Sequence, residues 1–169
     1  MKSNKFHHAF RINYNGITNQ LITECAIALP FALDQNLGKK FHPFKALWDT
    51  GATNSVITQK IVTELQLIPT GLAETQGVHG KSKVNTYIVD IGLPSSVCFQ
   101  NVVVSEGVSF NNFDLLIGMD IIQAGDFAIA NANGKTTFSF CHPAHDNPID
   151  LLEKSDKINP KKVQFRPTV

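Results

Sequence analysis

"LWDTGAT", residues 47–53, is the stretch that decides the fold of this chain. Two bulky apolar residues precede Asp49, and a glycine follows it two positions later. An apolar run that ends in Asp-Thr-Gly predicts a buried strand that leaves the core at a carboxylate and then turns. Gly51 lets the backbone pass close by, and its N–H can point at the carboxylate of Asp49. Asp49 is therefore our candidate reactive group.

Most of the chain outside this stretch also reads as short strands. Apolar or alternating runs end repeatedly at Gly, Pro, Asn or Asp, which predicts a mostly β domain. Strands are expected at 21–29, 43–49, 84–93, 97–105 and 114–122, with a hairpin over 127–140 that turns at Asn133-Gly134. One helix is expected over 58–67, with Thr58 as its N-cap, and a second short turn around 121–124.

Composition limits the domain organisation and the possible partners. With 169 residues, we expect one domain over 1–142 and a tail or extended arm over 143–169, where four prolines and several lysines replace core residues. A formal net charge of +1 gives no electrostatic case for nucleic acid or an anionic membrane. No signal-peptide pattern is visible, and the three cysteines are widely spaced. We therefore expect a cytoplasmic location.

Three motifs occur in an order that is typical of one protein family. "DTGA" (49–52) comes first, the glycine-bearing "TQGVHGKSKV" (75–84) follows, and the late apolar strand "LLIGMD" (115–120) comes last. Over about residues 20–142 the chain resembles the retroviral-type aspartic proteases (retropepsins), and especially their bacterial branch with DTGA and LIGMD motifs. This resemblance implies an all-β fold, a closed β-barrel that is half of an acid protease, with one or two short helices, and a homodimer that cleaves peptides without a cofactor.

The same resemblance implies roles for individual residues. Asp49, Thr50 and Gly51 would be catalytic, and the Thr50 hydroxyl would join the two loops of the dimer. The 75–84 segment would be a flap that covers the substrate. The expected substrate-binding residues are Ala52, Gly77, Val78, His79, Gly80 and Ile117, although for His79 at the flap tip a solvated position is the preferred interpretation.

The chemistry of peptide hydrolysis explains why a dimer is expected. One carboxylate must take a proton from water, and one carboxylic acid must give a proton to the carbonyl oxygen. The sequence contains one Asp-Thr-Gly, so the second acid would be Asp49 of another copy. The resulting prediction is an aspartic endopeptidase with a symmetric Asp49 pair. The alternative is a catalytically silent dimer of the same fold that binds peptides or mediates assembly.

Two positions depart from the viral pattern. Viral retropepsins usually have Asp after "DTGA" and Arg after the late glycine, and these two residues form an ion pair near the dimer interface. Thr53 and Met119 stand at the matching positions here. Both partners of the pair are absent together, so no buried charge is left unpaired. Contacts of the viral type across the dimer are therefore in question, whereas the catalytic residues are unaffected.

A second group of residues has the chemistry of metal ligands. "CHPAHD" (141–146) offers Cys141, His142, His145 and Asp146. A proline interrupts the motif and no second ligand pair is evident elsewhere, so we expect no metal site. His7 and His8 fall in an N-terminal segment that we expect to be flexible.

Overall fold

The computed structural model describes residues 6–30, 40–77, 80–107 and 111–159, without the side chains of 75–77, 80 and 81. The predicted flap-tip residues Val78 and His79 lie outside the described residues. None of the helices in the described part has the length and apolarity needed to cross a membrane.

The described residues form ten strands and three short helices, which confirms the mostly β prediction. Helix α3 lies within the segment expected to be a tail and was not predicted. The elements are β1 (His8–Asn13), β2 (Ile22–Ala28), β3 (His42–Trp48), β4 (Val56–Thr58), α1 (Gln59–Glu64), β5 (Gly71–Gly77), β6 (Gly80–Leu93), β7 (Val97–Gly107), β8 (Leu115–Ile117), α2 (Met119–Ile122), β9 (Asp126–Ala132), β10 (Lys135–His142) and α3 (Leu151–Ile158).

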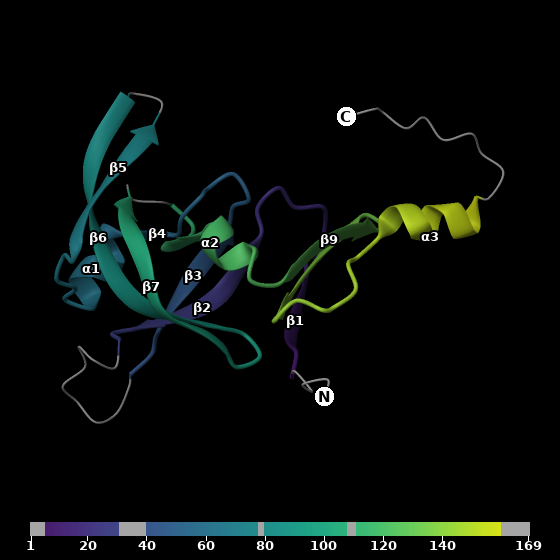
Figure 1. Ribbon diagram of the computed structural model, residues 1–169, viewed down its shortest axis with the longest axis horizontal. Helices are drawn as coiled ribbons and strands as arrows, with labels where there is room; N and C mark the ends of the chain where they lie inside the picture. The colour runs from purple at the N-terminus through teal and green to yellow at the C-terminus, as the bar shows by residue number, and fades with distance from the viewer. Residues whose placement is uncertain (1–5, 31–39, 78–79, 108–110, 160–169) are drawn as a thin grey trace.

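Six strands close into a barrel. The larger sheet has the order β2-β3-β8-β4-β7-β6-β5, and an additional pairing of β2 with β6 closes the ring. Strand β5 stands outside the ring and pairs with β6, so that these two strands form a long hairpin that projects from the barrel (Figure 1). The closed β-barrel expected from the sequence is confirmed.

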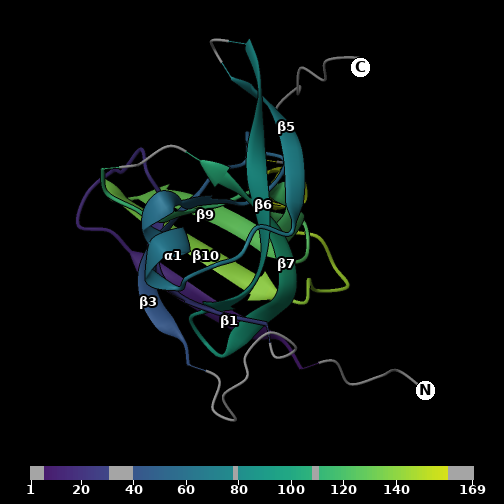
Figure 2. The ribbon, with the colours of Figure 1, turned by 90° about the vertical axis from the view of Figure 1, so that its left-hand side faces the viewer.

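A second, smaller sheet lies beside the barrel. Its strand order is β1-β10-β9, and Figure 2 shows these strands behind β6 and β7. Strand β1 pairs with β10 from His8↔His142 to Asn13↔Thr137. His8 therefore belongs to a strand, which corrects the expectation that the N-terminal segment is flexible. Strand β1 is ordered because its Phe10 side chain packs in the core, where Phe10 is 8% exposed.

Aromatic side chains join the two sheets. The Trp48 ring, at the end of β3, packs 5.1 Å from the Phe138 ring and 4.9 Å from the Phe140 ring, measured between centroids. Phe10 and Phe127 complete the cluster. The Trp48 indole N–H also donates to the Thr23 hydroxyl at 3.0 Å, which satisfies its one polar atom. Trp48 thus packs beside the Asp-Thr-Gly loop and fixes where that loop begins.

Local signals in the sequence were read correctly at two places. Asn133 and Gly134 have φ angles of 52° and 72°, as the predicted hairpin turn requires. Helix α1 lies within the predicted range, and Thr58 takes the N-cap position in extended geometry. Its hydroxyl does not cap the helix, however: it is buried, and among the described residues it has no hydrogen-bond partner.

The predicted strand 114–122 is wrong in its second half. The strand ends at Ile117, and Met119–Ile122 form helix α2, which begins two residues before the second short turn expected around 121–124. The Asp120 carboxylate accepts a hydrogen bond from the Ile121 N–H at 3.0 Å, which stabilises the first turn of a helix rather than a strand. Apolar residues on both faces suit a buried helix as well as a buried strand, so the pattern alone was ambiguous.

Phe138 tests whether the aromatic cluster holds the two sheets together. It is fully buried, so Phe138→Ala should lower the free energy of unfolding by about 3–5 kcal/mol. The cross-strand neighbour Ile129 is 49% exposed, and Ile129→Ala should lower it by less than about 1 kcal/mol. Urea unfolding followed by circular dichroism measures both. Equal losses would contradict this account of the packing.

Candidate active site

The Asp-Thr-Gly loop crosses the end of a neighbouring strand. Strand β8 lies between β3 and β4, parallel to β3 and antiparallel to β4. The loop that connects β3 to β4, residues 49–55, must therefore pass over the end of β8 (Figure 1). Consequently, the start of the loop lies beside the end of the "LLIG" strand, although the two segments are far apart in the sequence.

Gly118 makes this crossing possible. A Cβ atom on Gly118 would lie 2.6 Å from the carbonyl carbon of Asn54 and 3.0 Å from the carbonyl oxygen of Ala52. Both neighbours are backbone atoms, which cannot move aside as a flexible side chain could. Glycine is therefore required at position 118 because the loop backbone approaches so closely. The backbone conformation is not the reason, since any residue can adopt the Gly118 φ of −94°.

The backbone and a neighbouring N–H fix the Asp49 carboxylate. The Asp49 N–H donates to the Ile117 carbonyl at 2.9 Å, which aligns the loop with the end of β8. The Gly51 N–H donates to Asp49 Oδ1 at 2.8 Å, as the sequence predicted. The Ala52 N–H donates to the Asp49 carbonyl at 3.2 Å and closes the turn. Asp49 is half-buried, and the Gly51 N–H orients its carboxylate.

Asp120 and Ser55 tie the other end of the loop to helix α2, and sequence reasoning missed this role. Asp120 accepts from the Ser55 N–H at 2.9 Å and from the Ser55 hydroxyl at 2.8 Å. The Ser55 oxygen in turn accepts from the Gly118 N–H at 3.2 Å. A carboxylate directly after the late Gly-Met was a visible signal, but no local pattern indicated its partner.

Backbone hydrogen bonds also join the two segments that carry the positions of the absent viral ion pair. The Met119 N–H donates to the Ala52 carbonyl at 2.8 Å, and the Asp120 N–H donates to the Thr53 carbonyl at 3.1 Å. Met119 packs against the core, and Thr53 is exposed. The loop and α2 are thus held together without a charged pair between Thr53 and Met119.

The other predicted site residues fall in different environments. Thr50 is exposed and Ala52 is half-buried on the same loop as Asp49. Gly77 and Gly80 pair with each other at the end of the β5–β6 hairpin. Ile117 is fully buried, and the group it brings to the site is its backbone carbonyl. Direct substrate contacts by these residues stay predictions.

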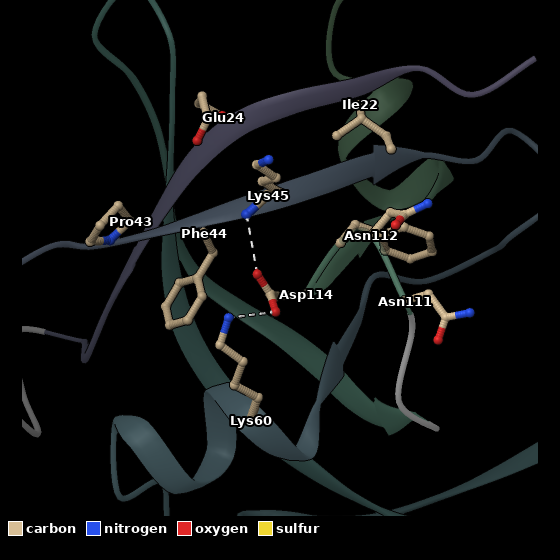
Figure 3. Close-up of a pocket in the computed structure, with 10 residues that line it drawn as sticks. Ile22, Glu24, Pro43, Phe44, Lys45, Lys60, Asn111, Asn112 and Asp114 are labelled. Atoms are coloured by element: carbon tan, nitrogen blue, oxygen red, sulfur yellow. Dashed lines mark hydrogen bonds and ion pairs between the residues drawn. The ribbon is translucent and has the colours of Figure 1, made fainter. Parts of the chain in front are cut away.

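A separate hollow lies elsewhere in the described structure. It has a volume of about 660 Å³, and its lining includes Phe44, Lys45, Lys60 and Asp114 but not Asp49 (Figure 3). The Lys60 ammonium lies 2.9 Å from Asp114 Oδ1, and the Lys45 backbone N–H donates to Oδ2 at 3.4 Å. This carboxylate is therefore engaged in holding α1 beside β3. The Asp49 carboxylate instead accepts from the Gly51 N–H of its own loop, while the Asp49 N–H donates to the Ile117 carbonyl of β8.

Gly118→Ala tests the close approach beneath the loop. The added methyl group must push the backbone of Asn54 away, so the free energy of unfolding should fall by about 1–3 kcal/mol. Gly16→Ala is the matched control, because nothing lies within 4 Å of a Cβ at that position. Urea unfolding of both variants measures the difference. If Gly118→Ala were as stable as Gly16→Ala, the loop would not be held as described.

Comparison with solved structures gives distant likenesses. The crystal structure of a retropepsin-like aspartic protease from Rickettsia conorii is 15% identical, with a TM-score of 0.46, and the match covers 83% of this chain and 98% of that chain. The retroviral protease-like domain of Ddi1 from Leishmania major is 16% identical, with a TM-score of 0.42, and the match covers 72% and 95%. No curated protein matches the chain.

A protein family gives the decisive match. The family described as "gag-polyprotein putative aspartyl protease" matches residues 39–124, just over half of the 169 residues. This range runs from β3 to α2 and includes Asp49, Gly118 and Asp120. The resemblance noted in the sequence is thereby confirmed at the level of the family. The chain belongs to the gag-type aspartyl protease family.

Proposed function

We propose that this protein is a homodimeric aspartic endopeptidase whose two catalytic carboxylates are Asp49 of each chain. The observation that carries the proposal is the Asp49 carboxylate itself, oriented by the Gly51 N–H on a loop that is fixed at both ends. Membership of an aspartyl protease family supports the reaction class. Sites of this kind need groups that are held in place before the substrate arrives.

The reaction requires the two acids to differ in protonation. Two carboxyl groups about 3 Å apart repel by about 5 kcal/mol when both are ionised, at an effective dielectric constant of about 20. The pair therefore holds one proton over a wide pH range. The ionised member takes a proton from water as the water oxygen attacks the carbonyl carbon, and the protonated member gives its proton to the carbonyl oxygen. Collapse of this adduct breaks the C–N bond: the acid that took the proton from water gives it to the leaving nitrogen, and the other carboxylate takes a proton from one hydroxyl group of the adduct, which restores the pair.

A twofold axis would supply the second acid. Each chain has one Asp-Thr-Gly, and an isologous dimer places two copies of the same loop face to face. Thr50 is exposed on this loop, so its hydroxyl is available to the opposite loop, as the resemblance implied. The backbone ties of Ala52 and Thr53 to α2 would keep each half rigid without the viral ion pair.

The proposed substrate is an extended segment of a peptide or protein. Strand β5 pairs with β6 alone, so its second edge is available in the described sheet to the backbone of an extended peptide. In this proposal the β5–β6 hairpin is the flap, with Gly77 and Gly80 next to its tip. Backbone hydrogen bonds would supply affinity, and side-chain pockets on either side of the cut would supply specificity.

Asp49→Asn tests the symmetric acid pair. The substitution removes both carboxylates of a dimer at once and should abolish cleavage of a broad peptide library. In a freely exchanging equal mixture with wild type, only about a quarter of the dimers keep both acids, so activity should fall to about half of that expected from the wild-type protein present. Solution mass measured alongside cleavage links the activity to the dimer.

Asp114→Asn is the matched control, because Asp114 is an aspartate that lines the separate hollow and lies outside the Asp-Thr-Gly loop. This variant should keep its cleavage activity. Activity in a strictly monomeric preparation would contradict the dimeric site. Peptide binding without cleavage by the wild type would instead favour the alternative of a silent binding module.

The pH–rate profile tests the surroundings of the acid pair. Ala52 stands where pepsin-like relatives often have Ser, so it supplies no hydroxyl to stabilise the ionised form. We expect maximal cleavage between about pH 4 and pH 7, because the pair must hold one proton in this range. A profile that peaks below about pH 3 would show that other donors stabilise the ionised form.

A further inference from the structure

Three potential metal ligands meet at the seam between the N-terminal segment and β10. One ligand atom each from His7, Cys141 and His145 lies within 4.8 Å of the other two. His7 directly precedes β1, Cys141 lies in β10, and His145 follows β10. The sequence offered no partner for the "CHPAHD" motif, but pairing of β1 with β10 brings His7 to it.

Hydrogen bonds leave the second nitrogen of each imidazole ready to bind a metal. His7 Nδ1 lies 2.9 Å from the Pro143 carbonyl oxygen, which can only accept, so Nδ1 carries the proton. His145 Nδ1 lies 2.6 Å from an Asp126 carboxylate oxygen and donates to it in the same way. Both Nε2 atoms therefore have a lone pair. A histidine whose Nδ1–H is held by a carboxylate or a carbonyl is the usual arrangement of metal-bound histidines.

The distances suit a tetrahedral ion after a small adjustment. His145 Nε2 lies 3.9 Å from Cys141 Sγ. Zinc–nitrogen and zinc–sulfur bonds of about 2.0 and 2.3 Å at a tetrahedral angle place such atoms roughly 3.6 Å apart. The other ligand atoms lie within 4.8 Å of one another, so they must move together by up to about 1 Å to reach tetrahedral spacing. The two imidazole rings are stacked with centroids 4.5 Å apart, and both histidines are exposed, so their side chains have room for this movement.

We propose that His7, Cys141 and His145 bind a zinc ion, with water in the fourth position. Two imidazoles and a thiolate suit zinc and exclude magnesium and calcium, which prefer oxygen ligands. The Asp126 carboxylate positions His145, because it accepts hydrogen bonds from both the backbone N–H and the Nδ1–H of His145. The ion would fasten the N-terminal segment to the end of β10. None of these residues belongs to the Asp49 loop, so the site does not depend on the proposed protease activity.

Zinc titration of the chelator-treated full chain tests this site. Isothermal titration calorimetry should give one zinc ion per chain, and zinc should raise the melting temperature. His7→Ala and Cys141→Ser should each weaken binding by at least about tenfold, and Asp126→Asn by about 10- to 100-fold. Cobalt, used in place of zinc, should show thiolate charge-transfer absorption that is lost in Cys141→Ser.

His8→Ala and Cys98→Ser are matched controls, because they remove a neighbouring histidine and an exposed thiol outside the cluster. Both should bind zinc as the wild type does. His7 is exposed, so His7→Ala keeps the core intact and gives a clear result even if Cys141→Ser does not fold. Unchanged zinc affinity in folded His7→Ala, or the same loss in His8→Ala, would overturn the proposal.

Discussion

The contact between Gly118 and the backbone of the crossing loop is the constraint on which the site depends. Strand β8 lies between β3 and β4, so the connection between those strands can only pass over the end of β8. The passage is so close that even a methyl group on Gly118 would meet the Asn54 carbonyl carbon at 2.6 Å. The position of Asp49 at the end of β3 is therefore set by the barrel, and the direction of the loop that follows does not depend on the loop sequence alone.

Rigidity has a particular value in a site built from two identical carboxylates. The acids repel each other, so a flexible loop would carry them apart. Here the loop is bonded to β8 through Asp49, and to α2 through the bonds of Ser55 to Asp120. Within the described chain this support comes from backbone N–H groups, the Ser55 hydroxyl and the Asp120 carboxylate. The proposed dimer would thus bring together two halves that are already ordered.

The smaller sheet supports the barrel strand that carries the candidate acid. Its Phe138 packs on Trp48, the residue directly before Asp49, so the sheet supports the strand that carries the candidate acid. The outer end of the same sheet brings His7 next to Cys141. In the proposed zinc site, an ion at that end would stabilise the pairing of β1 with β10, and the aromatic cluster would extend this support to β3.

The sequence by itself determined the features that depend on neighbouring residues. Strand periodicity, the positive φ angles at Asn133-Gly134 and the Gly51 N–H bonded to Asp49 were all predicted, because each follows from backbone geometry over a few positions. Only the tertiary structure decided that α2 begins after Gly118, that Asp120 holds Ser55, and that His7 meets "CHPAHD". These features join segments far apart in the chain, and only the packing of the barrel and the smaller sheet brings their atoms within bonding distance.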